Sequence, residues 1–216
     1  MNKIKTQLVR VVVLSVGLLA ASALSVAGEP VEIVALGDSL TAGLGVGPGD
    51  SFPEQLEAAI RERGHDVRVA NAGVSGDTAS DGLARLEWSV PAEADIVIVE
   101  LGANDALRGL DPSVTREALD ALLAKLDERG QATLLAGMQA PRNLGEEYAA
   151  AFDAIYPELA AEYRVAFYPF FLEGVAIDPA LNQSDGIHPN AAGVARIVEG
   201  MIPLVEELVI EASGDG

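Results

Sequence analysis

The sequence predicts an α/β domain of three layers, α/β/α, around a five-stranded, mostly parallel sheet. Two observations predict it. From residue 31 onward, short apolar runs alternate with longer segments of helical periodicity, which is typical of successive β-then-α units. The apolar runs are also continuous rather than alternating, as in strands that are buried on both faces of a parallel sheet. The 216 residues suit one domain, without a repeat or a low-complexity linker.

The expected elements follow one another in strict alternation. Strands are expected at 31–36, 67–72, 95–101, 132–137 and 165–170, and helices at 52–63, 78–89, 112–129, 146–162 and 191–210. Asp111 and Pro112 provide a cap and a proline at the first helical position, and His188-Pro189-Asn190 opens the last helix in a similar way. Pro157 should kink or split its helix because proline has no N–H to donate.

The first 27 residues differ in kind from the rest. Lys3, Lys5 and Arg10 precede the apolar run VVVLSVGLLAASALSVA, and Ser25-Val26-Ala27 places small residues at both positions that a signal peptidase reads. We therefore expect residues 1–27 to be a cleaved signal peptide and residues 28–216 to be the single mature domain, exported to the periplasm or secreted. An uncleaved N-terminal anchor is the alternative, but the run is at the short limit of the ~17–25 residues that a spanning helix needs.

Composition excludes several classes of function. The chain has 14 basic and 33 acidic residues, for a net charge of −19; loss of the three basic residues of the signal leaves 11 against 33, or −22. Such a surface repels phosphate backbones and anionic membranes, so we expect no nucleic-acid partner. No other stretch is long or apolar enough to span a membrane, so we expect no stable membrane anchor after cleavage. The absence of cysteine excludes disulfides, metal–thiolate sites and a thiol nucleophile.

Polar segments follow the first three expected strands and precede the last helix. They are GDSLTAG (37–43), NAGVSGDT (71–78), LGAND (101–105) and QSDGIHPN (183–190). Because ligands bind outside the carboxyl ends of the strands in open parallel sheets, all four segments can meet at one edge.

Two of these segments hold residues suited to nucleophilic catalysis. In the spacing Asp185-x-x-His188 the carboxylate can reach the imidazole Nδ1–H, which leaves Nε2 free to act as a base toward the hydroxyl of Ser39. The alternatives are an ordinary polar loop for the Asp–His pair and a helix cap for the serine. The other histidine, His65, is expected to be a solvated loop residue.

Hydrogen-bond donors for an oxyanion are available in the same segments. The backbone N–H of Gly73 can approach a substrate oxygen closely, and the Asn104 carboxamide is a neutral donor. With the N–H of Ser39 they would make three converging donors. Taken singly, Gly73 and Asn104 are more often a turn glycine and a turn asparagine.

The motifs together resemble a known family. GDSL at 37–40, Gly73, GAND at 102–105 and DGIH at 185–188 resemble, in order and spacing, the signature of SGNH (GDSL) hydrolases, and in particular their bacterial periplasmic arylesterase, acyl-CoA thioesterase and lysophospholipase group. The resemblance implies a flavodoxin-like fold, Ser39 as nucleophile, His188 as base, Asp185 as its orienting partner, and an oxyanion hole of Ser39, Gly73 and Asn104. It implies no metal, no organic cofactor and no obligate protein partner.

The expected activity is hydrolysis of carboxylic esters or thioesters through an acyl-enzyme. Four side chains could line an apolar acyl groove or could simply anchor loops on the core: Leu107, Leu110, Met138 and Leu144. The charge disfavours polyanionic acyl-CoA and favours neutral short-to-medium acyl esters, with lysophospholipids as a further candidate. The alternatives are a carbohydrate O-acetyl esterase of the same fold and a non-catalytic binding module. The chain is 5% aromatic, and its single tryptophan, Trp88, is expected in the core rather than on a sugar platform.

Overall fold

The computed structural model describes residues 29–214, so the expected signal peptide lies outside the described residues. The strands are β1 (Val31–Gly37), β2 (Val67–Gly73), β3 (Ile96–Glu100), β4 (Ala132–Ala136) and β5 (Ala166–Tyr168). The longer helices are α2 (Phe52–Glu62), α3 (Ala79–Ser89), α5 (Pro112–Glu128), α6 (Glu146–Asp153), α7 (Ile155–Tyr163) and α8 (Ala191–Ser213). Three short helices, which the sequence did not predict, lie in connections: α1 (Ser39–Ala42), α4 (Ala103–Leu107) and the 3₁₀ turn η1 (Arg142–Leu144). Across residues 29–214, no helix is both long and apolar enough to span a membrane.

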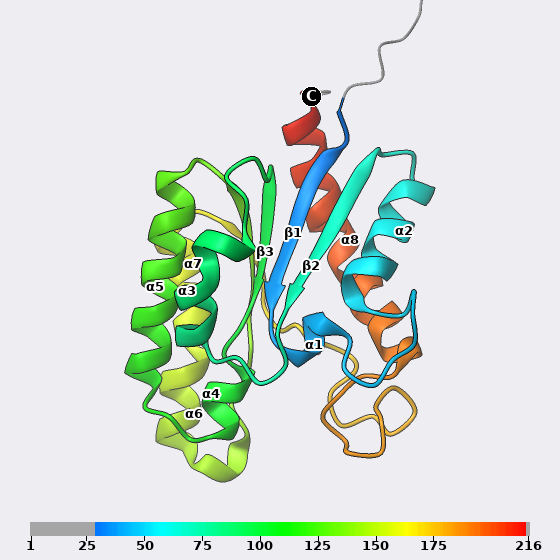
Figure 1. The fold of residues 1–216 in the computed structure, drawn as a ribbon. Coiled ribbons are helices and arrows are strands. Elements are labelled where there is room, and N and C mark those ends of the chain that lie inside the picture. Colours follow the sequence, from blue (N-terminus) through cyan, green and yellow to red (C-terminus); the bar gives the residue numbers. More distant parts are fainter. Residues whose placement is uncertain (1–28, 215–216) are drawn as a thin grey trace, which may run out of the picture.

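The sheet is parallel throughout, with strand order β2-β1-β3-β4-β5. Helices α2 and α8 cover one face, and α3, α5, α6 and α7 cover the other (Figure 1). The predicted three-layer α/β/α architecture and the five parallel strands are confirmed. This strand order is that of flavodoxin-like folds, in which the crevice for a ligand opens at the carboxyl ends of the two strands where the order reverses, here β1 and β3.

The core is built on the three central strands. Every residue of β3 is buried, as are nearly all residues of β1 and β4. The expectation that all five apolar runs are buried on both faces is wrong for β2 and β5. Only Val67 is buried in β2, and all of β5 is half-buried. Both are edge strands, which pair with a single neighbouring strand.

Local signals account for the helix boundaries. The Asp111 side chain accepts a hydrogen bond from the Ser113 N–H at 2.9 Å, with Pro112 at the first helical position, as predicted. The last helix is capped by Asn190, whose side chain accepts from Ala192 and Gly193. The predicted helix 146–162 is split at Ala154 into α6 and α7. The break lies one turn before Pro157, as expected from its missing N–H and ring clash.

The prediction for Trp88 is wrong. Its side chain, near the end of α3, is 75% exposed and does not belong to the core. The buried face of α3 is formed by residues such as Ala79, Gly82 and Leu86. Trp88 lies outside this face, so its apolar character does not indicate burial.

Candidate active site

The turn from β1 into α1 places a serine at the carboxyl end of the sheet. Asp38 caps the helix, because its Oδ1 accepts the Leu40 N–H at 2.9 Å. The capping role considered for Ser39 therefore falls to its neighbour, and Ser39 becomes the first helical residue, 8% exposed. A side chain at Gly37 would overlap Thr41 and come within 2.7 Å of a Glu100 oxygen, so only glycine fits this turn.

Three side chains from opposite ends of the chain form a continuous line of hydrogen bonds. Ser39 Oγ lies 3.0 Å from His188 Nε2, and His188 Nδ1 lies 2.7 Å from Asp185 Oδ2. Asp185 Oδ1 also accepts the backbone N–H groups of Ile187 and His188, at 3.0 and 3.1 Å, which fixes the turn. Because a carboxylate accepts the Nδ1–H, Nε2 is left to accept the hydroxyl proton of Ser39.

The electrostatics of Asp185 agree with this arrangement. The hydrogen bond with His188, and then the two backbone N–H groups, lower the pKa of this carboxyl to about 2. Asp185 is therefore ionised throughout the neutral and mildly acidic range. Its side chain is 46% exposed, and contact with water also favours the charged form.

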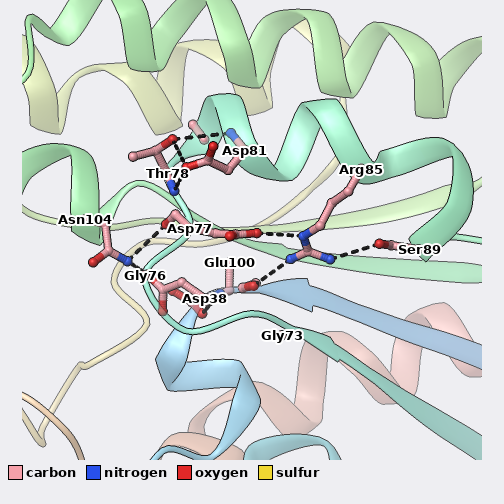
Figure 2. A network of polar contacts seen from close by, with 12 residues as sticks. Asp38, Gly73, Gly76, Asp77, Thr78, Asp81, Arg85, Ser89, Glu100 and Asn104 are labelled. Atoms are coloured by element: carbon pink, nitrogen blue, oxygen red, sulfur yellow. Dashed lines mark hydrogen bonds and ion pairs between the residues drawn. The ribbon is translucent and has the colours of Figure 1, made fainter.

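Asn104, at the start of α4, is held by two acceptors. Its Nδ2 donates to Asp38 Oδ2 at 2.9 Å and to the backbone oxygen of Asp77 at 3.0 Å (Figure 2). The first contact joins it to the residue before Ser39, and the second joins it to the loop that follows β2. The amide is thereby placed at the lining of the same cavity as Ser39 and His188.

A second carboxyl group lies beside Asp38 and is entirely buried. Glu100, the last residue of β3, accepts from Thr41 Oγ1 at 2.8 Å and from the Asp38 N–H at 3.3 Å through Oε2. Its Oε1 has no hydrogen-bond partner in the described part of the chain. Burial, and then the neighbouring Asp38, raise the pKa of Glu100 well above its usual value. Burial also raises the pKa of Asp38 to about 6, against its hydrogen bond from Leu40 and the nearby His188.

Gly73 ends β2 directly beside α1. A Cβ at this position would overlap the backbone of Ala42 and lie 2.9 Å from the Asp38 oxygen. Its N–H donates to the Asn71 side-chain oxygen at 3.0 Å. The sequence suggested that the Gly73 N–H can approach a substrate oxygen closely. In the structure, the close neighbour of Gly73 is the backbone of α1.

An apolar cavity of about 620 Å³ opens beside these residues. Leu107 and Met138 of the expected groove line it. Its polar lining residues are Asp38, Ser39, Asn104, Gln139, Arg142, Asn182 and His188. The other two groove candidates, Leu110 and Leu144, do not belong to its lining, which corrects that expectation. The sequence missed the apolar residues Ala140, Phe170, Leu172, Ile177 and Ile187, which also line it.

Ile177 lies on an exposed part of the cavity wall. Ile177 is 92% exposed at φ 62°, an unfavourable conformation for a β-branched residue. His65 lies outside the cavity, in the loop between α2 and β2 as expected, but it is half-buried because its Nε2 contacts Glu206 of α8 at 3.1 Å.

Comparisons with known proteins identify the family of this chain. The GDSL-like Lipase/Acylhydrolase family matches residues 35–196. Esterase TesA of Pseudomonas aeruginosa is 37% identical over 89% of this chain and 96% of its own length. The thioesterase 1/protease 1/lysophospholipase L1 of Escherichia coli K12 is 38% identical over 82% and 84%. The crystal structure of AlinE4, an SGNH-hydrolase family esterase, is 47% identical with a TM-score of 0.71, over 83% of this chain and 97% of that one. The resemblance to SGNH (GDSL) hydrolases is confirmed, and the chain belongs to the GDSL-like lipase/acylhydrolase family.

Proposed function

We propose that this protein is a serine esterase that hydrolyses carboxylic esters or thioesters through an acyl-enzyme on Ser39. The single observation that carries the proposal is the line of contacts Asp185–His188–Ser39, at 2.7 and 3.0 Å, at the wall of an apolar cavity. A hydroxyl, a base within hydrogen-bond reach and a third group that orients the base are the parts that nucleophilic catalysis requires. Membership of a family of lipases and acylhydrolases supports the same reaction.

The proposed reaction has two steps, acylation of Ser39 and hydrolysis of the acyl-enzyme. Ser39 Oγ attacks the acyl carbon while His188 Nε2 takes its proton, and the proton then passes from Nε2 to the departing alcohol or thiol. A water molecule repeats the sequence on the acyl-enzyme and releases the acid. Asp185 stays ionised, holds the Nδ1–H and stabilises the imidazolium that forms in each step.

The proposed oxyanion hole consists of the N–H groups of Ser39 and Gly73 and the amide of Asn104. No hydrogen bond within residues 29–214 uses the Ser39 N–H, so that donor is ready for a substrate oxygen. The other two donors already have acceptors: Asn71 for Gly73, and Asp38 and Asp77 for Asn104. A substrate oxygen must therefore share or replace those acceptors as it becomes negative, when charge-assisted hydrogen bonds are strongest.

Neutral short-to-medium acyl esters are the substrates that the cavity suits best. Its volume of about 620 Å³ is in the range of small-molecule sites, and apolar side chains dominate its walls. The strongly acidic composition disfavours approach by polyanionic acyl-CoA, especially at low salt. Lysophospholipids are the second candidate, because they combine an apolar chain with a zwitterionic head.

Carbohydrate acetates are less well supported. Phe170 is the one aromatic side chain in the lining of the cavity, and Trp88 is not part of it. A sugar platform of stacked aromatic rings is therefore missing from the walls that the structure describes. A non-catalytic binding module would not need the complete line of contacts from Asp185 to Ser39.

Export remains part of the proposal. Residues 1–27 have the order of a signal peptide, and we propose cleavage after Ala27 and delivery to the periplasm. N-terminal sequencing of the protein recovered from the periplasmic fraction tests this. A mature chain that still begins at Met1 would contradict it.

The activity is tested with p-nitrophenyl esters from acetyl to palmitoyl, on the mature protein and on Ser39→Ala and His188→Ala. Both variants should lose ~10⁴-fold or more in kcat, as in other serine triads. His65→Ala is the matched control, because it removes the other histidine at a place away from the cavity, and its kcat should be unchanged. A wild-type protein that is inactive on the whole series, or a Ser39→Ala variant as active as wild type, would contradict the proposal.

A further inference from the structure

A buried arginine joins the two parts of the candidate site. Arg85, on α3, is 5% exposed. It is the only lysine or arginine that is buried among residues 29–214. Burying a guanidinium costs free energy unless its donors are all engaged. The side chain contacts Asp77, Gly37 and Ser89, and two of these three belong to segments of the site.

The first contact fixes the loop between β2 and α3. Arg85 Nε lies 2.6 Å from Asp77 Oδ2, and this ion pair is shielded on both sides, with side-chain exposures of 7% and 14%. The backbone oxygen of the same Asp77 accepts a hydrogen bond from Asn104 Nδ2 at 3.0 Å. Any shift of this loop therefore moves an acceptor of the Asn104 amide.

The second contact fixes the end of β1. Arg85 Nη2 donates to the backbone oxygen of Gly37 at 2.9 Å, two residues before Ser39. The same oxygen accepts the Val74 N–H at 3.0 Å, so the loop after β2 and the guanidinium hold it from two directions. Figure 2 shows the guanidinium between Asp77 on one side and the end of β1 on the other.

The third contact, with Ser89 Oγ at 3.1 Å, lies within α3 and leads away from the cavity. This contact engages the third guanidinium nitrogen, Nη1, and it provides a control variant. Ser89→Ala removes a hydrogen bond of Arg85 without touching either segment of the site.

We propose that Arg85 is a positioning residue for ester hydrolysis, whose planar guanidinium sets the separation between the nucleophile turn 37–39 and the amide of Asn104. The proposal rests on the proposed function. Arginine suits this role because its rigid fork reaches a carboxylate and a carbonyl in one plane, whereas a lysine ammonium acts as a point charge. Arg85 itself touches no reacting atom.

The test compares Arg85→Lys and Arg85→Met with Ser89→Ala in steady-state hydrolysis of a p-nitrophenyl ester. Circular dichroism gives the melting temperature of each variant, and the kinetics are measured well below that temperature, where the variant is folded. A misplaced oxyanion donor costs up to the ~10²–10³-fold of a lost one, so kcat should fall ~10²-fold in Arg85→Met and ~10-fold in Arg85→Lys. KM should stay within about threefold of wild type, because the acyl cavity is untouched. Ser89→Ala should keep the wild-type kcat.

A double-mutant cycle separates positioning from a general loss of stability. If Arg85 acts through Asn104, the variant Arg85→Lys/Asn104→Ala should be no slower than Asn104→Ala alone, since the group being positioned is gone. Additive losses would overturn the proposal. Arg85→Lys keeps the buried charge and so supports the test even where Arg85→Met fails to fold.

Two results distinguish the failure of this proposal from that of the proposed function. Wild-type kcat in folded Arg85→Lys and Arg85→Met, with only the melting temperature lowered, would overturn the role of Arg85 and leave the esterase assignment intact. An inactive wild-type protein would overturn both.

Discussion

The carboxylate of Asp38 accepts a hydrogen bond from the Asn104 amide at 2.9 Å, while its other oxygen caps the helix that begins at Ser39. One buried side chain therefore connects the proposed nucleophile with a proposed oxyanion donor. Because these groups come from the ends of β1 and β3, the contact spans the point where the strand order reverses. Asp38 is therefore a structural part of the site as well as the residue that precedes the proposed nucleophile.

Replacing Asp38 by Asn should lower kcat by about 10- to 100-fold, less than the loss of ~10²–10³-fold from deleting an oxyanion donor. The new NH₂ group cannot accept from Asn104, so the amide of Asn104 loses one of its two acceptors. Steady-state kinetics measure the effect. An unchanged kcat in Asp38→Asn would show that this acceptor does not orient Asn104.

The stability difference between wild type and Asp38→Asn should depend on pH. Burial raises the pKa of Asp38 from 3.8 to about 6, so the folded state binds this proton more tightly than the unfolded state. Its ionisation therefore costs stability at neutral pH, and the cost is relieved as the pH falls through about 6 toward 4. Urea unfolding should show the wild type gaining on Asp38→Asn over that range.

Asp185→Asn is the matched control with the opposite sign. Hydrogen bonds to His188 and the backbone lower the pKa of Asp185 from 3.8 to about 2. Its contribution to stability is present above 3.8 and is lost as the pH falls toward 2. The difference between wild type and Asp185→Asn should therefore shrink as the pH falls from about 4 toward 2, the opposite direction to Asp38→Asn. A difference for Asp38→Asn that stays constant from about pH 6 to about pH 4 would contradict the raised pKa of Asp38.

Replacing Glu100 by Gln should change kcat little, within about threefold, because a glutamine has nearly the shape of a neutral carboxyl group. Burial and the adjacent Asp38 raise the pKa of Glu100 well above its usual value, which favours the neutral form of this side chain. Kinetics at neutral pH test the expectation, with Glu100→Ala as the variant that removes the contact with Thr41. A large loss of activity in Glu100→Gln would indicate an ionised Glu100.

Replacing Ile177 by Gly should raise stability and lower activity on longer esters together. Ile177 lies at φ 62°, which is unfavourable for its backbone, and it is 92% exposed, so its side chain contributes little to stability. Relief of the left-handed conformation is worth up to about 1 kcal/mol, or ~2–4 °C in Tm. Loss of an apolar wall should cost roughly tenfold in kcat/KM for octanoyl esters, about the free energy of partly burying one such side chain.

The chain-length profile is the measurement for Ile177, and acetyl ester hydrolysis should be unchanged. Trp88→Ala is the control, because it removes an exposed apolar side chain that does not line the cavity. Equal losses on acetyl and octanoyl esters in Ile177→Gly would argue against contact with the acyl chain.

Replacing Gly73 by Ala should destabilise the protein by about 1–3 kcal/mol, the usual cost of overpacking. The added methyl group would overlap the backbone of Ala42, which cannot rotate away. Gly47→Ala is the comparison, since its Cβ would meet only the Asp50 carboxylate at 3.2 Å. Thermal unfolding of the two variants measures the difference. Equal melting temperatures would show that α1 shifts at no cost.

Much of the fold was predictable from local patterns. Continuous apolar runs, Asp111-Pro112 and Pro157 placed the strands, a helix start and a helix break close to where they lie. The family match bears out the four motifs, and the spacing Asp185-x-x-His188 correctly predicted a direct contact at 2.7 Å. These features depend on neighbours within a few residues of each other, which is the range that a sequence pattern can describe.

The amino-acid sequence by itself determined the architecture, the family and the candidate Ser39, Asp185 and His188. Tertiary structure alone decided which strands lie at the edge, which apolar side chains reach the cavity, and which partners hold Asn104. Leu110 and Leu144 do not line the cavity whereas Ile177 does, and nothing in their local sequence distinguishes them. Arg85 and Glu100 read as ordinary charged residues until the packing of α3 and β3 buries them, because burial and the partners of a charge are properties of the folded chain.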